Sequence, residues 1–248
     1  MLTFYNEHHA QHRGRYEMFR GEQVPCFEKP ERADMVLAEF ERRGLGQVVT
    51  PHGVSLVSLE RIHTPRYLHF LRGAWNEWVA LDEANAGKDA FPSVWPIRGM
   101  RSDIEPDNFA ARMGLYSMDS GTPLTAGTWI AAKTGADCAV NAAHALRLGE
   151  RGTFALTRPP GHHAGADFFG GYCFLNNAAL AASTCSTTAR KRSRSSTSTT
   201  TTATAPRASS TAGATCCSCR STPTRAASIR FTWAMPMKRA RARVQAAT

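Results

Sequence analysis

Apolar and polar residues along positions 1–182 follow two different periods. Runs of apolar residues at 1–5 and 152–157 are short enough to predict buried β-strands. In longer segments the apolar residues recur three and four positions apart, which predicts helices with one buried face. This mixture of strands and helices predicts an α/β domain. The helices are expected at 30–43, 64–84 and 126–148, and a further helix begins near residue 177.

The helix expected at 30–43 shows how this spacing selects core residues. Its apolar side chains are Met35, Val36, Leu37 and Phe40. They recur at the spacing of one helix face, which in an α/β domain packs against the rest of the protein. We therefore expect these four side chains to lie in the core.

Two adjacent histidines follow the strand expected at 152–157, in the string Arg158-Pro-Pro-Gly-His162-His163-Ala-Gly. The Pro-Pro-Gly sequence ends the strand sharply. Ligands of α/β proteins bind beyond the carboxyl ends of the strands, and neutral imidazoles transfer protons near pH 7. His162 and His163 are therefore candidate catalytic residues. When the pair is considered alone, a turn with one buried, hydrogen-bonded histidine is the better explanation; the full string favours the catalytic one.

A second string, Phe168-Phe-Gly-Gly171-Tyr172-Cys-Phe-Leu-Asn-Asn177, follows closely. Its glycines allow the backbone to approach a ligand, and Tyr172 supplies an aromatic wall. The two strings together resemble the histone deacetylase and acetylpolyamine amidohydrolase superfamily, and its acetylpolyamine amidohydrolase branch most closely. The resemblance covers residues 1 to about 182. Further matching segments lie at 21–25, 63–71, 95–96 and 122–129.

The resemblance implies a fold, an activity and a cofactor. The fold is a three-layer, arginase/deacetylase-like parallel sheet of eight strands flanked by helices, truncated here to about half. The activity is zinc-dependent hydrolysis of acetylated polyamines or similar N-acetyl amines. His162 and His163 match the catalytic pair, and Gly171 and Tyr172 match the tunnel wall that grips the methylene chain of the substrate.

A long segment at 85–122 is rich in Gly, Pro, Asp and Arg. Long loops inside a compact domain are usually functional or disordered. In the resembling amidohydrolases an insertion here builds a homodimer and narrows the mouth of the active site. Acidic residues at its edge meet the cationic substrate, and Asp119 is the best candidate for that role. A solvated loop carboxylate explains Asp119 equally well.

Three histidines near the N-terminus, His8, His9 and His12, form a second cluster. The spacing His-His-x-x-His in a loop is compatible with a metal ion. Solvated loop histidines are the better explanation of so short a motif, so we assign no metal ligand here.

Charge separates the chain into two parts. Residues 1–182 hold 18 Lys and Arg and 20 Asp and Glu, whereas 183–248 hold 12 Lys and Arg and no acid. The net charge of +10 therefore comes wholly from the Ser/Thr-rich segment 183–248. Its composition predicts disorder, and at face value a basic tail suggests nucleic acid as a partner.

The remaining composition narrows the class of protein. A length of 248 residues suits one large α/β domain or two small ones. Cys26, Cys138 and Cys173 show neither disulfide nor zinc-finger spacing, and the other four cysteines lie in 183–248. No segment is apolar enough to cross a membrane, and the N-terminus has no apolar signal region. We expect a cytoplasmic protein with reduced thiols and no membrane partner.

The segment 183–248 has a second explanation, translation one base out of register. In that case, the first two bases of each codon as read here are the last two bases of a codon in the original frame. A Thr codon, ACN, then corresponds to an original codon that ends in AC and encodes Asp, Tyr, His or Asn. Residues 197–205, Thr-Ser-Thr-Thr-Thr-Thr-Ala-Thr-Ala, then permit Asp-Val-Asp-Tyr-His-His-Gly-Asn-Gly. That is the family's metal-binding signature, at the family's distance from Asn177. Segments 215–225 and 228–238 permit further family motifs in the same frame.

This interpretation changes what the chain is expected to do. In family register Thr199 and Thr201 occupy positions of zinc ligands, and Thr197 occupies that of a carboxylate that orients a histidine. The remaining ligand and a catalytic tyrosine are expected beyond residue 248. We therefore assign no metal ligand in this chain and no nucleic-acid partner. The alternatives are an amidohydrolase of acetylated amines and an inactive, frameshifted fragment without zinc.

Overall fold

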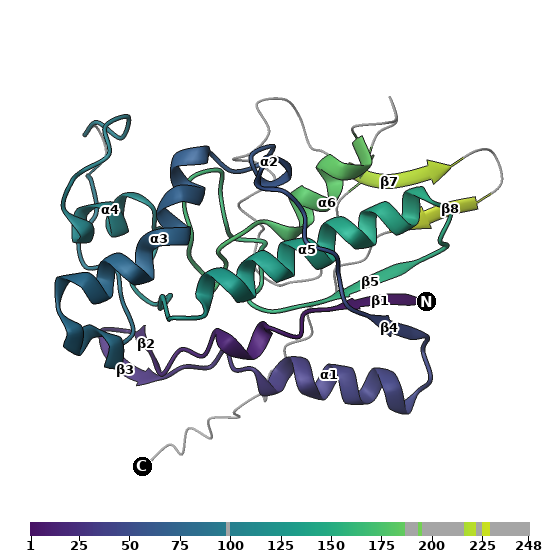
Figure 1. Cartoon of the computed structure of the whole chain (residues 1–248), viewed down its shortest axis with the longest axis horizontal. Helices are drawn as coiled ribbons and strands as arrows, with labels where there is room; N and C mark the ends of the chain where they lie inside the picture. Colours follow the sequence, from purple (N-terminus) through teal and green to yellow (C-terminus); the bar gives the residue numbers. More distant parts are fainter. Residues whose placement is uncertain (98–99, 187–192, 195–215, 222–224, 229–248) are drawn as a thin grey trace, which may run out of the picture.

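Three short parallel strands form a sheet (Figure 1). β1 (Leu2–Tyr5) lies between β4 (Gln47–Val49) and β5 (Thr153–Leu156) and pairs with both in parallel. The expected parallel sheet flanked by helices is thus confirmed. The computed structural model describes residues 1–97, 100–186, 193–194, 216–221 and 225–228.

Helices cover the two faces of this sheet. α5 (Thr128–Arg147) runs along one face and α1 (Glu31–Arg42) along the other, as Figure 1 shows. α6 (Asn177–Ser186) packs on α5 through alanine side chains, so the helices approach closely. Within the described ranges, no helix has the length and apolar character needed to cross a membrane.

The buried face of α1 differs from the expected one. Phe40 is buried and stacks on Phe154 of β5 with ring centroids 6.4 Å apart. Leu37 is half-buried, but Met35 is 68% exposed and Val36 is 41% exposed. The expectation that all four apolar residues are core is wrong because the narrow sheet covers only a thin strip of the helix.

The largest core lies around α3 (Pro65–Leu81), away from the sheet. Thr64 caps this helix, because its hydroxyl accepts a hydrogen bond from the Tyr67 amide at 3.4 Å. α2 (Leu56–Leu59) precedes it, and η2 (Glu83–Gly87) follows it. The buried apolar side chains of this core include Tyr67, Phe70, Leu71, Phe109, Met113, Tyr116, Phe169 and Phe174.

The segment 85–122 is not a loop throughout. It contains α4 (Phe109–Leu115), which is capped by the Asn108 side chain accepting from the Ala111 amide at 3.1 Å. Phe109 and Met113 of α4 are buried in the core around α3. A helix as short as α4 has too few apolar positions to be recognised by periodicity alone.

A β-hairpin and a 3-10 turn follow β1. η1 (His9–Gln11) leads to β2 (Tyr16–Phe19) and β3 (Glu22–Pro25), which pair antiparallel. Arg20 and Gly21 at the tip have φ values of 54° and 86°, the left-handed conformation that tight hairpins need. The hairpin crosses toward the loops that follow β5, and so brings an N-terminal segment to the site.

The carboxyl ends of β1 and β5 are joined by Asn6. Its amide nitrogen donates to the carbonyl oxygens of Ala131 and Arg158, both at 2.9 Å. Asn6 is completely buried, so these bonds are shielded from water. The start of the loop that carries the histidine pair is therefore fixed to both β1 and α5.

The segment 183–248, which we expected to be disordered, contains described structure. α6 continues to Ser186, where Ser186 and Thr184 hydroxyls donate to the carbonyls of Ala182 and Leu180 at 3.0 and 2.9 Å. Short strands β6 (Ser193–Arg194), β7 (Cys216–Ser221) and β8 (Arg225–Ser228) pair antiparallel. The expectation of disorder for this segment stays a prediction, and most of the segment lies outside the described residues.

Candidate active site

The two candidate catalytic histidines lie just beyond the carboxyl end of β5. The rings of His162 and His163 are in contact, with centroids 4.3 Å apart and planes inclined by 56°. Both side chains are half-buried. The loop therefore holds two imidazoles side by side at the edge of a parallel sheet, where α/β proteins bind ligands.

Both imidazoles are biased toward the neutral form. Burial, and to a smaller extent the neighbouring His163, lowers the pKa of His162 to about 4. Burial also lowers the pKa of His163, against the opposing effect of the negative charge on Asp119. At pH 7 the pair can therefore accept protons, as a general base requires.

One nitrogen of the pair lacks a partner. The Nδ1 atom of His163 is buried and has no hydrogen-bond partner among the described residues. The same is true of Oδ1 of Asn177, at the start of α6. A buried polar atom without a partner costs about 1–3 kcal/mol, so such atoms mark places where a further group fits.

The glycines of the second string form a left-handed turn against His163. Gly170, Gly171 and Tyr172 have φ values of 154°, 55° and 65°. A Cβ atom on Gly171 would lie 2.6 Å from Cδ2 of His163, which is closer than atoms pack. Glycine at 171 is therefore required both by the backbone conformation and by the histidine ring.

Asp119 holds this turn in place. Its carboxylate accepts a short hydrogen bond from the Gly171 amide. It also accepts from the amides of Gly121 and Thr122 at 3.0 and 2.9 Å, and from the Thr122 hydroxyl at 3.0 Å. The structure thus brings Asp119 to the site, half-buried and bound to two loops, and its role toward a substrate stays a prediction.

Tyr172 is anchored at both ends. Its amide donates to the Thr122 hydroxyl at 3.0 Å, and its own hydroxyl donates to Oε1 of Glu17 at 2.8 Å. Burial, followed by the Glu17 carboxylate, raises the pKa of Tyr172, so the phenol stays protonated. Sequence reasoning missed Glu17, because a lone acid between Tyr16 and Met18 gives no sign of burial.

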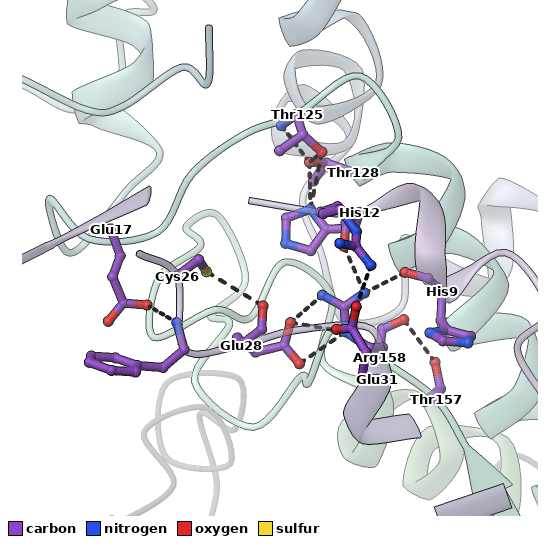
Figure 2. A network of polar contacts seen from close by, with 12 residues as sticks. His9, His12, Glu17, Cys26, Glu28, Glu31, Thr125, Thr128, Thr157 and Arg158 are labelled. Atoms are coloured by element: carbon purple, nitrogen blue, oxygen red, sulfur yellow. Dashed lines mark hydrogen bonds and ion pairs between the residues drawn. The ribbon is translucent and has the colours of Figure 1, made fainter. Parts of the chain in front are cut away.

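A buried ion pair fixes the other side of the histidine loop (Figure 2). Arg158 and Glu28 are each about 2% exposed at the side chain. Nε of Arg158 lies 3.0 Å from both carboxylate oxygens, and a second nitrogen donates to the carbonyls of His9 and His12 at 2.5 and 2.6 Å. The loop is therefore tied to the N-terminal segment. Sequence reasoning missed Glu28, for which no motif gave a signal.

His9 and His12 are buried, so the expectation of solvated loop histidines is wrong for them. Nδ1 of His12 lies 2.9 Å from the Thr128 hydroxyl at the start of α5, as Figure 2 shows. Burial, and to a smaller extent the charge of Arg158, lowers the pKa of His12 to about 3. These histidines are structural because α5 and Arg158 cover them. His8 stays nearer the surface, with Nδ1 3.2 Å from Nε2 of Gln11.

The comparison with known proteins decides the family. Residues 26–194 match the family described as the histone deacetylase domain. The chain belongs to the histone deacetylase family. Over 182 residues it is 47% identical to acetylpolyamine amidohydrolase 2 of Pseudomonas aeruginosa, covering 73% of this chain and 52% of that protein. It is 38% identical to the acetylpolyamine amidohydrolase of Mycoplana ramosa, with the same coverage.

A solved structure shares the deacetylase fold. The crystal structure of acetylpolyamine aminohydrolase from Burkholderia pseudomallei superposes with a TM-score of 0.67 and 34% identity. The match covers 74% of this chain and 52% of that one. The chain thus spans about half the length of the curated relatives it matches.

The zinc ion that this family implies does not fit the described residues. Throughout the described ranges, no group of three or more His, Cys, Asp or Glu side chains is placed to hold a metal ion. Thr199 and Thr201, which we expect at the positions of the family's ligands, lie outside those ranges. The chemistry of this half of the site therefore rests on the histidine pair and its surroundings.

We predict that Glu28→Gln destabilises the protein strongly. The substitution leaves the buried Arg158 guanidinium without a charged partner, which costs about 3 kcal/mol or more. Urea unfolding followed by circular dichroism measures the change. Glu31→Gln is the matched control, because Glu31 pairs with Arg13 at the surface. Equal losses for the two variants would contradict a structural role for the buried pair.

We also predict that the unfolding free energy falls as the pH drops from about 6.5 to 4. In the unfolded chain histidine binds a proton near pH 6.5. In the folded protein the pKa of His162 and of His63 is about 4, so the unfolded state binds more protons in this window. His162→Gln should flatten the slope measured by denaturant titration at several pH values. An unchanged slope would show that His162 is not held neutral.

Proposed function

We propose that residues 1–182 form half of an amidohydrolase that removes the acetyl group from acetylated polyamines or similar N-acetyl amines. The observation that carries this proposal is the contact of two neutral imidazoles, His162 and His163, at the carboxyl end of β5. The names of the relatives from Pseudomonas aeruginosa and Mycoplana ramosa support this substrate class.

The side chains of this half supply proton transfer and substrate positioning. One imidazole of the pair takes the proton of the attacking water, and this proton passes through the pair to the amine as the carbon–nitrogen bond breaks, so that both imidazoles end neutral. The turn at Gly171 and the ring of Tyr172 form the wall along which the methylene chain of the amine lies. Because the wall packs directly on His163, the substrate chain and the proton-transfer group are held in one unit.

Zinc dependence is proposed for the protein read in its restored frame. Threonine hydroxyls, as at 199 and 201, are poor zinc ligands beside carboxylate and imidazole. Three observations support a frame change near codon 183. The alignments with acetylpolyamine amidohydrolases span 182 residues. All excess positive charge follows residue 182. The Nδ1 atom of His163 is buried without a hydrogen-bond partner among the described residues.

The alternative function is that of an inactive fragment. It is favoured if the 248-residue chain is the natural product, because the described residues contain no cluster of metal-binding side chains. Under either alternative we propose no nucleic-acid and no membrane partner. The basic segment 183–248 is explained by the shifted frame.

A homodimer through the segment 85–122 is also proposed. This segment exposes several large apolar side chains close together in sequence, which is unusual for a surface that faces only water. An interface there would cover them and narrow the approach to the site. The exposed residues are Val94, Trp95, Ile97, Met100 and Ile104.

We predict that restoring the frame restores zinc binding. The 248-residue chain should retain no stoichiometric zinc and should not hydrolyse N-acetylputrescine. The full-length protein made after inserting one base near codon 183 should bind one zinc per chain and lose activity when a chelator removes it. Elemental analysis and a coupled acetate assay measure both. One tightly bound zinc in the 248-residue chain would contradict the proposal.

We predict that the restored protein prefers small acetylated diamines to acetyl-lysine within a folded protein. A narrow mouth admits a thin chain, and we propose that Asp119 attracts the distal ammonium of that chain. Asp119→Asn should therefore lower kcat/KM for acetylated diamines about 5- to 150-fold more than for an uncharged acetamide of equal length.

The uncharged acetamide is the control for the structural role of Asp119. The Gly171 amide binds this carboxylate, so some loss common to both substrates is expected. Equal losses on both would remove Asp119 from substrate binding. Turnover of a histone peptide equal to that of N-acetylputrescine would contradict the substrate class.

A further inference from the structure

Glu17 is a buried carboxylate in an otherwise exposed hairpin. Its side chain belongs to β2, where Tyr16, Met18 and Phe19 are all exposed while Glu17 is only 3% exposed. This is the reverse of the usual arrangement, because burying a carboxylate is unfavourable unless it is well hydrogen-bonded. The hydrogen bonds of Glu17 therefore indicate what it does.

The carboxylate joins two segments that are far apart in sequence. Oε2 accepts a hydrogen bond from the Phe27 amide at 3.0 Å, which anchors Glu17 to the segment after β3. Oε1 accepts from the Tyr172 hydroxyl at 2.8 Å. One oxygen thus fixes Glu17, and the other binds the hydroxyl of Tyr172, the residue that follows the Gly171 packed on His163.

The backbone of Tyr172 makes this contact more significant. Tyr172 has a φ of 65°, a conformation that non-glycine residues rarely adopt and that costs about 1–3 kcal/mol. The Thr122 hydroxyl holds its amide at 3.0 Å. The backbone bond sets where the side chain begins, and the bond to Glu17 sets the direction of the ring.

We propose that Glu17 is a positioning residue that holds the ring of Tyr172 in line with the substrate channel. The proposal rests on the proposed function, in which this ring is the wall along the methylene chain. Glu17 acts through Tyr172 and does not touch the reacting atoms. Without Glu17, the ring of Tyr172 moves out of the wall. The methylene chain of the substrate is then bound more weakly in the ground state and in the transition state alike. KM then rises while kcat is kept.

The contact itself is tested by titrating Tyr172 in the 248-residue chain. The groups that face the phenol are the carboxylates of Glu17 and Asp119, the thiol of Cys26, which is neutral near pH 7, and the guanidinium of Arg32; burial and Glu17 raise the pKa of Tyr172 most. In NMR spectra of the protein labelled with 13Cζ-tyrosine, the signal that disappears in Tyr172→Phe is that of Tyr172. Glu17→Gln preserves the shape but removes the charge, so the phenol should titrate at lower pH. Glu22→Gln, on the exposed strand β3 of the same hairpin, should leave it unchanged.

The positioning role is tested by a double-mutant cycle in the frame-restored protein. Glu17→Ala and Tyr172→Phe should each raise KM for N-acetylputrescine roughly 3- to 10-fold, the effect of one hydrogen bond. The double variant should be no worse than either single variant, because both remove the same contact. Glu22→Gln should retain the parent's KM.

The outcomes separate this proposal from the proposed function. Additive effects on KM, or a Tyr172 signal that titrates identically in the parent and in Glu17→Gln, would overturn the role of Glu17. Inactivity of the restored parent toward acetylated diamines would instead refute the proposed function. The NMR titration would then still decide whether Glu17 holds Tyr172.

Discussion

The buried guanidinium of Arg158 is the constraint on which the site depends. A desolvated charge is tolerated only where every donor finds a partner, and Arg158 finds them in Glu28 and in the carbonyls of His9 and His12. These partners come from the N-terminal segment, whereas Arg158 comes from the end of β5. The loop that carries His162 therefore starts from a point fixed to residues well over a hundred positions earlier.

Periodicity predicted the parts of the fold that bury a whole face. The strands at 1–5 and 152–157 and the helix at 126–148 correspond to β1, β5 and α5, each of which buries side chains against neighbouring elements. The core face of α1 was predicted wrongly at Met35 and Val36. The spacing of apolar residues locates a helix, but the width of the surface it meets decides which of them are buried.

The candidate site was predictable only where a motif carried it. His162, His163 and Gly171 stand in two specific strings, and the structure brings all three together. Glu17 and Glu28 stand in no motif, and they were missed because a carboxylate is expected at the surface. Their burial follows from partners contributed by distant segments, and such pairing is invisible to any local pattern.

The central claim is that residues 183–248 are read one base out of register, so that the site lacks the half that would complete the histidine pair. The coding nucleotide sequence across codons 180–205 tests this most directly. The account predicts that the shifted frame runs without a stop codon through Asp-x-Asp-x-His-His-Gly-Asn-Gly. A stop codon upstream of that motif, or codons whose shifted translation gives neither Asp nor His at these positions, would contradict it.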